Sequence, residues 1–467
     1  MSEDILDGFF LPPALEDAAE FIEMDLGSGV KLRQAVAAPE LIATAAAHLR
    51  KHARNTLRRM PLDGVIGLLD AAAEEWLAAR APDHHAVMRA MAAATGFSPE
   101  MVWESVRVEQ ESSRAGDMRA ALANEFGDAG VLDGFVRRAQ ANARVRALGP
   151  ELTFCLSPGN IPALSHLPFM RALLVKSPVL CKTAHAEPVY AAAYARTLAR
   201  LEPALEDCMA VLYWPGGSVA LEEAALNEAD AVIAFGTQAT CDSIARHARP
   251  ATRLVLHGHK LGFAVIGEGA PPPEPLAAAL AYDVAMFDQQ ACLSPHWVFV
   301  EGDPAPLAGA LVDALRRQQA ALPKGTPPVE ERVAFARAWD DAELAGAMGE
   351  PVRVHSRRGA DNFLVVSGPP PLQPSCLGRA VRLVPFEGLE GLRACLAAFA
   401  GYFQNACVEA GPEATPRYAE LLAELGVTRV CRAGQMATPT MMWHHDGYPC
   451  IEALVRYCDM DERPGPG

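Results

Sequence analysis

The sequence predicts an α/β protein with a helical N-terminal region, a domain built on a parallel β-sheet, and a second α/β domain. Three observations support this class. The chain has 467 residues, 51% apolar and 21% charged, a balance that supports two or three domains with large cores. Up to about residue 148 the apolar residues recur at helical spacing. After Glu151 short apolar runs alternate with helical stretches, as in βαβ units.

The helices of the N-terminal region have recognisable starts. Pro39 opens a long run of helical periodicity, and proline is well tolerated in the first turn of a helix. A second run, GVIGLLDAAAEEWLAAR (64–80), has apolar residues at the same spacing. Ser98 and Pro99 have the order of an N-cap and a first helical residue, so a further helix should begin there.

Short apolar runs after Glu151 predict parallel strands that are buried on both faces. The first five runs are ELTFCLS (151–157), VLCKT (179–183), CMAVLYW (208–214), AVIAF (231–235) and RLVLH (253–257). Similar runs resume later in the chain, among them WVFVEG, NFLVVS and AVRLVPF, with helical stretches between them. These later runs predict the second α/β domain.

The charge balance excludes several classes of function. With a net charge of −16 the surface repels phosphate backbones, so no nucleic-acid partner is expected. The acidic start, MSEDILDGFF, is unlike a signal peptide, and no apolar run reaches the roughly 18 residues of a membrane span. We therefore expect a cytoplasmic protein without a membrane span.

The 11 cysteines form no CxxC pair, which argues against a disulfide framework and against a structural zinc site. His444, His445 and Asp446 have side chains that bind metals, but adjacent histidines project in different directions and no third ligand lies nearby in the sequence. No metal is therefore expected.

Two loops carry residues suited to acyl-transfer chemistry. In FDQQACLSPHWVFV (287–300), Cys292 lies where a polar loop enters an apolar strand, and a thiolate there is a strong nucleophile. In LSPGNIPALS (156–165), a tight turn after a strand presents Asn160, whose amide is a suitable oxyanion donor. From spacing alone, a core thiol and an ordinary turn residue remain the alternatives.

Taken together, the two loops resemble the aldehyde dehydrogenase superfamily. There an oxyanion-hole Asn lies in a Pro-x-Asn-x-Pro turn and the nucleophile in a GQxC loop; here the turn is PGNIP (158–162) and the loop QQAC (289–292). VLCKTAHAEP (179–188) resembles the strand that ends in a ribose-binding lysine. AVIAFGTQAT (231–240) resembles the Phe-x-Gly-Ser cofactor turn.

Within this superfamily the chain resembles the bioluminescence-type acyl-CoA reductases, the LuxC family. The shared features are GNIP in the turn, the loop pattern D-Q-x-x-C-x-S, HGHK (257–260), LGVTRVCRAGQMATP (425–439) and HHDGYPCIEALVRY (444–457). The resemblance covers about residues 130–460. It implies an aldehyde dehydrogenase-like fold, with a parallel-sheet cofactor domain, an α/β catalytic domain and a helical N-terminal region.

The implied organisation has four parts. They are a helical region at 1–148 that packs on the cofactor domain and ends in a short oligomerisation arm, a nicotinamide-cofactor domain at 149–257, a catalytic domain with the nucleophilic cysteine at 258–434, and a C-terminal return and oligomerisation segment at 435–467. This arrangement implies a homo-oligomer.

The resemblance also assigns roles to residues. Cys292 is the expected nucleophile, with Asn160 as the oxyanion donor. The cofactor-binding residues are Lys182, His185, Gly236 and Thr237. NAD-preferring members often have a glutamate, which repels a 2′-phosphate, where this chain has the histidine. We therefore expect NADPH as the cofactor, with NADH as the alternative.

Two departures from the superfamily pattern affect the chemistry. Aldehyde oxidisers have a Glu-Leu-Gly-Gly motif whose glutamate activates water, but HGHK contains no carboxylate. A thioester on Cys292 would then accept hydride rather than water, which favours a reductase. His257, His259 and His296 are the candidate proton donors, each with a structural role as the alternative. SCLGR (375–379) lacks the ribose-binding glutamate of the E-x-F-G-P motif.

We therefore expect an aldehyde-forming oxidoreductase that reduces a fatty acyl-CoA or acyl-protein thioester with NADPH through an acyl-cysteine intermediate. A reversible CoA-acylating aldehyde dehydrogenase and an acyl-phosphate reductase are the enzyme alternatives. The non-enzyme alternative is a partner subunit that binds acyl-CoA. The expected partners are the coenzyme A thioester and a protein that donates the acyl group.

Overall fold

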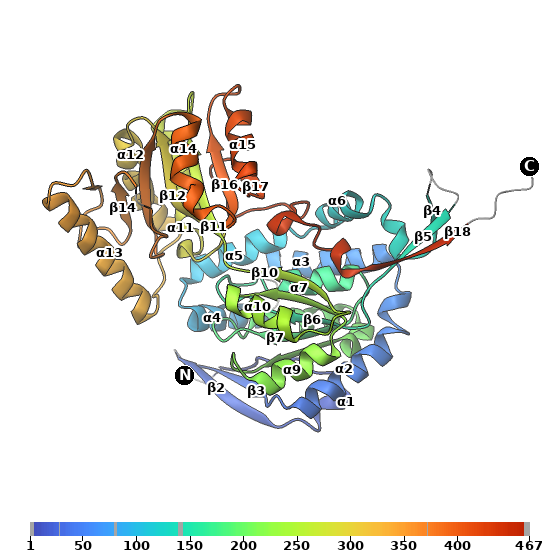
Figure 1. Cartoon of the computed structure of the whole chain (residues 1–467). Helices are drawn as coiled ribbons and strands as arrows, with labels where there is room; N and C mark the ends of the chain where they lie inside the picture. Colours follow the sequence, from blue (N-terminus) through green and yellow to red (C-terminus); the bar gives the residue numbers. More distant parts are fainter. Residues whose placement is uncertain (1–3, 28, 79–81, 139–142, 371, 462–467) are drawn as a thin grey trace, which may run out of the picture.

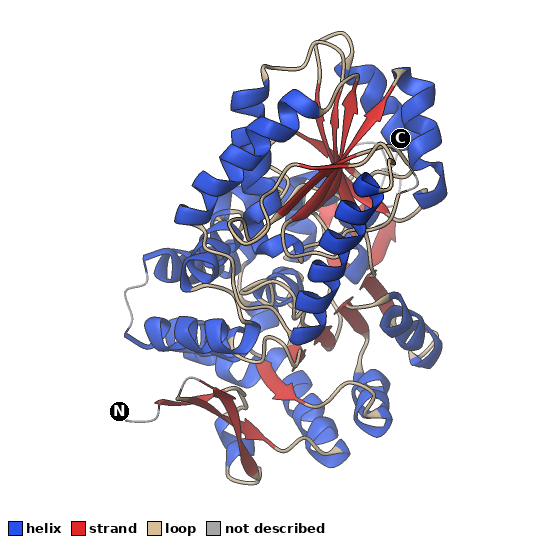
Figure 2. Ribbon diagram, turned by 90° about the vertical axis from the view of Figure 1, so that its left-hand side faces the viewer, coloured by secondary structure: helices blue, strands red, loops and turns tan. Residues whose placement is uncertain are grey.

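The computed structural model describes residues 4–27, 29–78, 82–138, 143–370 and 372–461. These residues form four β-sheets of three, five, seven and three strands, and helices surround the two larger sheets (Figures 1 and 2). The five-stranded and the seven-stranded sheet lie in different parts of the molecule, and the catalytic candidates lie between them. The expected α/β architecture with two parallel-sheet parts is confirmed.

A small sheet that the sequence did not predict precedes the helices. It consists of β1 (Asp4–Asp7), β2 (Phe21–Gly27) and β3 (Val30–Ala35), in the order β1-β3-β2. Gly27 has φ +79°, a left-handed conformation that glycine adopts without strain, and it closes the β2–β3 hairpin. Backbone hydrogen bonds between Phe10 and Val211 attach this part of the chain to the five-stranded sheet.

Five helices follow, and three of them lie in the predicted runs that begin at Pro39, in 64–80 and after Ser98. The five are α2 (Pro39–Ala53), α3 (Leu62–Ala78), α4 (Pro82–Thr95), α5 (Pro99–Glu111) and α6 (Ala115–Phe126). The predicted N-cap is confirmed, because the Ser98 hydroxyl accepts a hydrogen bond from the Met101 backbone N–H at 3.2 Å. Pro39 and Pro99 lie in the first turns of their helices.

All five predicted strands form one parallel sheet, called here the five-stranded sheet. Its members are β6 (Thr153–Leu156), β7 (Val179–Thr183), β8 (Met209–Tyr213), β9 (Ala231–Phe235) and β10 (Arg253–His257), in the order β10-β9-β6-β7-β8. Helices α7 (His166–Leu174), α8 (Tyr190–Leu201), α9 (Val219–Glu228) and α10 (Gln238–His247) connect them. The winding direction reverses between β6 and β9, and ligands of such sheets bind at the carboxyl ends of the strands at this point.

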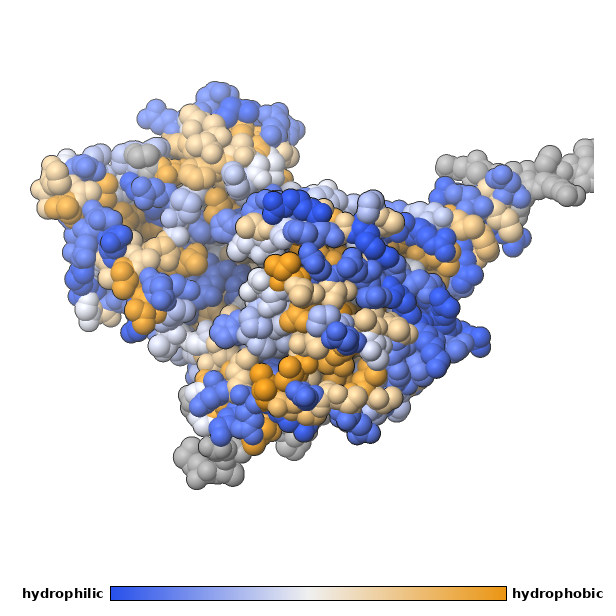
Figure 3. All heavy atoms as spheres, turned by 60° about the horizontal axis from the view of Figure 1, so that its bottom comes forward, coloured by the Kyte–Doolittle hydropathy of each residue, from blue (hydrophilic) through white to orange (hydrophobic). Residues whose placement is uncertain are grey.

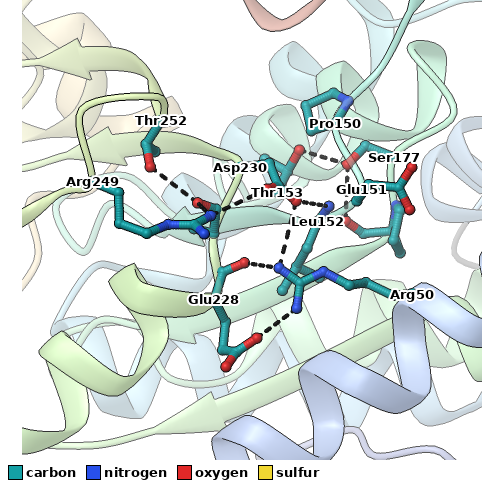
Figure 4. A network of polar contacts seen from close by, with 12 residues as sticks. Arg50, Pro150, Glu151, Leu152, Thr153, Ser177, Glu228, Asp230, Arg249 and Thr252 are labelled. Carbon is teal, nitrogen blue, oxygen red and sulfur yellow. Dashed lines mark hydrogen bonds and ion pairs between the residues drawn. The ribbon is translucent and has the colours of Figure 1, made fainter.

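A polar network fastens the opposite edge of this sheet, where the strands begin (Figure 4). Arg50 of α2 contacts Glu228 at 2.5 Å and Asp230 at 3.5 Å. Asp230 accepts a hydrogen bond from the Leu152 backbone N–H and contacts Arg249 at 3.1 Å. The network ties α2 and the starts of β6 and β9 together, which leaves the carboxyl edge available for the site.

The second sheet has seven strands in the order β13-β14-β15-β12-β11-β16-β17, all parallel except β13. Its strands are β11 (Leu261–Ile266), β12 (Pro295–Glu301), β13 (Arg353–Val354), β14 (Leu364–Ser367), β15 (Ala380–Phe386), β16 (Phe403–Glu409) and β17 (Arg429–Cys431). Its helices are α11 (Pro273–Ala285), α12 (Ala305–Ala321), α13 (Val329–Ala347), α14 (Gly388–Leu396) and α15 (Thr415–Glu424). The cysteine-bearing loop enters this sheet at β12.

An antiparallel arm projects from the body of the molecule at the right of Figure 1. It contains β4 (Val136–Arg137), β5 (Ala143–Leu148) and β18 (Arg456–Asp461), with β5 in the middle. The strand β18 therefore returns from the end of the catalytic part to pair with the segment before β6.

The face seen in Figure 3 is largely hydrophilic with scattered apolar side chains, in agreement with the acidic composition. Among the described residues, no helix combines the length and the apolar character that crossing a membrane requires.

Candidate active site

A cavity of about 420 Å³ brings most of the predicted site residues together. Its wall is formed by the turn after β6, the carboxyl ends of β9 and β10, the end of α5, the loop before β12 and the segment after β17. Among the expected residues, the wall includes Asn160, Gly236, Thr237, His257, His259, Cys292 and His296. Both large sheets thus contribute to one site.

The loop that carries the cysteine (residues 287–294, the cysteine loop) has a strained backbone. Phe287, Asp288 and Gln289 have φ values of 55°, 47° and 66°, and three consecutive non-glycine residues in this region are unusual. Such conformations cost on the order of 1–3 kcal/mol each and persist where surrounding contacts impose them. The contacts of this loop therefore help to position Cys292, the predicted nucleophile.

A buried ion pair imposes this loop conformation. Arg379 is 1% exposed, and its Nε donates a hydrogen bond to Asp288 Oδ1 at 2.6 Å. The other carboxylate oxygen accepts from the Gly325 backbone N–H at 3.0 Å. The Gln289 amide donates to the carbonyls of Pro295 and Ala380 at 2.8 and 2.9 Å. The loop is thereby attached to β12 and β15.

The turn after β6 contacts the cysteine loop directly. Asn160 Nδ2 donates a hydrogen bond to the Gln290 carbonyl at 2.8 Å. A side-chain amide has two N–H donors, so one remains for another acceptor. The structure therefore places the predicted oxyanion donor next to the loop of the predicted nucleophile, although the two lie 132 positions apart in the sequence.

The Cys292 thiol is half-buried and protonated at neutral pH. Burial, helped by the negative charge of Asp446, raises the pKa of Cys292 to about 12. Hydrogen bonds from the Gln404 side chain and from backbone N–H groups favour the thiolate, but they do not offset burial. Because the thiolate is the nucleophile, an attack by Cys292 at neutral pH requires a proton acceptor nearby.

His257 has no free nitrogen. Its Nδ1 donates to Asp446 Oδ2 at 2.7 Å, and its Nε2 accepts from Arg171 Nη1 at 3.1 Å. Burial, together with the Arg171 charge, lowers the pKa of His257 well below its usual value, so the ring is neutral. The HGHK stretch itself holds no carboxylate, but the fold brings Asp446 to it from 189 positions away.

The expected cofactor residues lie at the carboxyl edge of the five-stranded sheet. Lys182 is the next-to-last residue of β7, and its Nζ is 5.8 Å from the centre of the Trp214 ring. His185 Nδ1 lies 2.9 Å from the Tyr213 hydroxyl at the end of β8. These residues lie beside the cavity rather than in its wall.

The turn after β9 provides the remaining cofactor candidates. Thr237 is the N-cap of α10, because its hydroxyl accepts from the Thr240 backbone N–H at 3.2 Å. A Cβ on Gly236 would lie 3.1 Å from the Thr240 side chain, so glycine lets the turn approach the helix closely. Helix N-termini favour phosphate groups, and this one opens at the cavity.

The sequence can now be compared with known families. A family model described as "Acyl-CoA reductase (LuxC)" matches residues 57–457 of the chain. The chain belongs to the LuxC family.

Curated relatives agree with this membership. The "Long-chain acyl-protein thioester reductase" of Photorhabdus luminescens is 26% identical over 421 residues, which cover 88% of this chain and 84% of the relative. The protein of the same name from Aliivibrio fischeri is 25% identical over 415 residues, covering 86% and 83% of the two chains. The similarity to LuxC proteins therefore extends over most of both chains.

Solved structures confirm the aldehyde dehydrogenase-like fold. Aldehyde dehydrogenase 21 from Physcomitrella patens superimposes with a TM-score of 0.75 at 13% identity and covers 99% of both chains. The NADP-dependent glyceraldehyde-3-phosphate dehydrogenase from Bacillus halodurans, solved with NADP, has a TM-score of 0.70 at 14% identity, covering 94% of this chain and 95% of its own.

In this LuxC-family chain four site residues were missed by sequence reasoning: Arg171, Gln404, His445 and Asp446. Gln404 Nε2 donates to Asp446 Oδ1 at 2.7 Å, so Gln404 links Asp446 to Cys292. The HHDG stretch that carries two of the four was part of the LuxC resemblance, but nothing local marked it as catalytic. Arg171 and Gln404 had no signal in the sequence.

The other two predicted proton donors occupy different environments. His296 is buried, its Nδ1 accepts from the Ser375 backbone N–H at 3.0 Å, and burial lowers its pKa to about 4. His259 is exposed at the cavity wall. Neither side chain is hydrogen-bonded to Cys292, and a neutral His296 is a poor proton donor.

Two histidine and aspartate clusters among the described residues have metal-binding atoms within 4.8 Å of one another. In the first, His257 and Asp446 use their ligand atoms for hydrogen bonds with each other, Arg171 and Gln404, which leaves only the His445 nitrogens uncommitted. His257 is the third member of this cluster, and the sequence alone did not place it near His445 and Asp446. The second cluster, His48, His52 and Asp207, lies outside the cavity wall, with a 2.7 Å contact between His48 and Asp207.

Proposed function

We propose that the chain reduces a fatty acyl thioester, carried by coenzyme A or by a protein, to the aldehyde with NADPH through an acyl-Cys292 intermediate. The observation that carries this proposal is the meeting of the cysteine loop and the Asn160 turn in one cavity through the 2.8 Å hydrogen bond to the Gln290 carbonyl. A thiol beside an amide donor is the arrangement that acyl transfer requires.

The composition of the cavity wall supports an acyl chain as the ligand. Apolar side chains from both sheets and from the C-terminal segment dominate it, among them Ile161, Leu164, Leu167, Phe235, Leu293, Met441 and Trp443. Apolar walls with a few placed polar groups are typical of small-molecule sites. The curated relatives, named long-chain acyl-protein thioester reductases, agree with a fatty acyl group and with a protein as its donor.

The residues beside the cavity fit a nicotinamide dinucleotide. In this proposal Lys182, whose ammonium lies near Trp214, would bind ribose hydroxyls, and the N-terminus of α10 after Gly236 would meet the phosphates. When bound, the nicotinamide would supply the hydride. His185 carries no negative charge that would repel a 2′-phosphate, which favours NADPH.

The surroundings of the thioester favour reduction over hydrolysis. Aldehyde oxidisers use the glutamate of the Glu-Leu-Gly-Gly motif to activate water, but the equivalent HGHK stretch has no carboxylate, and the nearby Asp446 has both oxygens hydrogen-bonded. When the thiol attacks the acyl carbon, the oxyanion that forms would accept hydrogen bonds from the Asn160 amide and the Cys292 backbone N–H. The missing glutamate argues against an aldehyde oxidiser. A reversible CoA-acylating dehydrogenase is therefore the second candidate.

The arm supports a homo-oligomer. Tyr457 and Met460 of β18 are 38% and 42% exposed on a three-stranded sheet that projects from the body of the molecule. A partner subunit on this arm would cover them.

The overall test is NADPH oxidation at 340 nm with a panel of acyl-CoAs from acetyl to palmitoyl, with the aldehyde identified as product. Turnover that depends on chain length would support the proposal. Acyl phosphates as the only substrates, or binding of acyl-CoA without turnover by the protein in the presence of either nicotinamide, would favour the alternatives.

Asn160→Ala should lower kcat by about 10²–10³-fold, because removal of one oxyanion donor costs that much in comparable sites. The change removes the amide and its contact to Gln290 but leaves the thiol in place. Steady-state NADPH oxidation with a saturating acyl-CoA measures it. Asn362→Ala, at an exposed position outside the cavity wall, is the control and should behave as wild type.

His185→Glu should shift the preference from NADPH towards NADH by roughly tenfold, since a carboxylate there would repel a 2′-phosphate. Binding of both cofactors, followed by quenching of tryptophan fluorescence, measures the ratio of dissociation constants. His185→Gln separates charge from the loss of the Tyr213 contact and should change both affinities alike. An unchanged ratio in the glutamate variant would place the 2′-phosphate elsewhere.

A further inference from the structure

His445 is an imidazole in the cavity wall without any hydrogen-bond partner among the described residues. It is 8% exposed, and its Nε2 is fully buried. Its ring is stacked on His257 at 3.9 Å and on Trp443 at 4.4 Å, so the ring plane is fixed from both sides. A buried polar atom without a partner costs stability, so its presence in the wall of the cavity needs an explanation.

The surroundings place His445 and Cys292 around the same carboxylate. His445 Nε2 lies 3.9 Å from Asp446 Oδ2. The charge of Asp446 also acts on the Cys292 thiol, and Gln404 contacts both the thiol and the carboxylate. Asp446 has φ +58°, a left-handed conformation that is uncommon outside glycine and that turns the chain directly after His445.

Of the histidines in the cavity wall, His445 is the one suited to exchange a proton in the buried part of the site. His257 has both nitrogens bonded, His296 has one nitrogen bonded to Ser375, and His259 is exposed. The Cys292 thiol, in contrast, lacks an evident acceptor for its proton.

We propose that His445 is the general base that accepts the proton of Cys292 when the thiol attacks the acyl thioester, with Asp446 stabilising the protonated ring. With Nε2 facing Asp446, Nδ1 is the nitrogen that exchanges the proton. This inference rests on the proposed function and names the residue that makes its first half-reaction work at neutral pH.

The step balances without an oxidant or reductant. The Cys292 Sγ–H proton moves to His445 while Sγ bonds to the carbonyl carbon, and the carbonyl electron pair moves to the oxygen. When the oxyanion collapses, the bond to the carrier sulfur breaks and the proton on His445 passes to that sulfur. The products are acyl-Cys292 and the free carrier thiol.

The test is the acylation half-reaction, which needs no nicotinamide. Wild type is mixed with myristoyl-CoA, and acyl-Cys292 and free coenzyme A are followed by rapid quench and intact-protein mass spectrometry. His445→Phe keeps a flat ring between His257 and Trp443, and His445→Gln keeps polarity. Both variants should acylate about 10²–10⁴-fold more slowly. His444→Gln, a neighbouring exposed histidine, should acylate at the wild-type rate.

The pH profile separates a base from a packing residue. The charged and titratable groups that act on the ring are Arg171 on α7, His257 on β10 and the neighbouring Asp446, and the Cys450 thiol contacts the His445 backbone carbonyl. Without the base, only the thiolate fraction reacts, so the acylation rate of both His445 variants should rise about tenfold per pH unit from pH 7 to 9. Wild type should be nearly flat over this range.

The outcomes are distinguishable. Failure of wild type to acylate with myristoyl-CoA, or with the same acyl group on a carrier protein, would overturn the proposed function. The role of His445 would be overturned if wild type acylates and a folded His445→Phe or His445→Gln variant acylates at the same rate, with the same pH profile, as wild type. Cofactor binding and melting temperature establish that a variant is folded.

Discussion

Cys292→Ala should form no acyl-enzyme and no aldehyde, with turnover lowered roughly 10⁴-fold or more. The reason is chemical, since the methyl group cannot bond to the acyl carbon and no other residue in the cavity is held by the same loop and the same amide donor. The strained backbone of residues 287–289 and the hydrogen bond from the Asn160 side-chain amide to the Gln290 carbonyl do not involve the thiol, so both stay intact in the variant. Loss of activity would therefore report the thiol itself.

The matched control for this prediction is a second thiol of the same cavity. Cys450 also belongs to the cavity wall but is buried, with its Sγ 3.5 Å from the Tyr448 carbonyl. Cys450→Ala should retain acylation and turnover within a few-fold of wild type. The acyl adduct should be found by peptide mapping at residue 292 alone. Aldehyde formation by Cys292→Ala would contradict the assignment and move the nucleophile elsewhere.

Arg379→Ala should destabilise the protein by about 3–5 kcal/mol, the usual cost when one partner of a buried ion pair is removed. Asp288, 5% exposed, would lose its ion pair and keep the Gly325 backbone hydrogen bond and the nearby charge of Lys324. The loop could then leave its left-handed conformation, so acylation of Cys292 should also slow. Urea unfolding followed by circular dichroism measures the first effect, and the half-reaction with acyl-CoA measures the second.

An exposed ion pair provides the comparison. Arg358 contacts Asp340 at 2.7 Å and Glu343 at 3.1 Å on the surface of α13, where solvent screens the charges. Arg358→Ala should leave the unfolding midpoint and the acylation rate almost unchanged. An Arg379→Ala protein with the midpoint and acylation rate of wild type would show that other contacts hold the cysteine loop.

The five-stranded sheet was predictable because each strand is a short apolar run bounded by polar or turn residues, and all five runs became strands. The small N-terminal sheet was not predicted, although β2 (FIEMDLG) alternates Ile22, Met24 and Leu26 with acidic residues, a pattern of half-buried strands, and most of its residues are exposed. Its turn at Gly27 was a signal for a hairpin, but the helical pattern that follows dominates this part of the chain. The local sequence pattern thus predicted the strands that are buried on both faces of their sheet.

The candidate site likewise has residues that local motifs predicted and contacts that they did not. Cys292, Asn160 and the Gly236 turn could be found because each lies in a short motif at the carboxyl end or the start of a strand. The contacts that set the chemistry join distant residues instead: His257 with Asp446 over 189 positions and Arg171 with His257 over 86. No local pattern specifies such pairs, because they depend on how the two large sheets pack.

The C-terminal segment has a consequence for biosynthesis. The strands of the five-stranded sheet are complete at residue 257 and the cysteine loop at 294, but the proton acceptor and its carboxylate follow only at 445 and 446. A polypeptide still on the ribosome can therefore present Cys292 before the segment that carries His445 and Asp446 has been made. The proposed acylation site is thus complete only once nearly the whole chain has been synthesised.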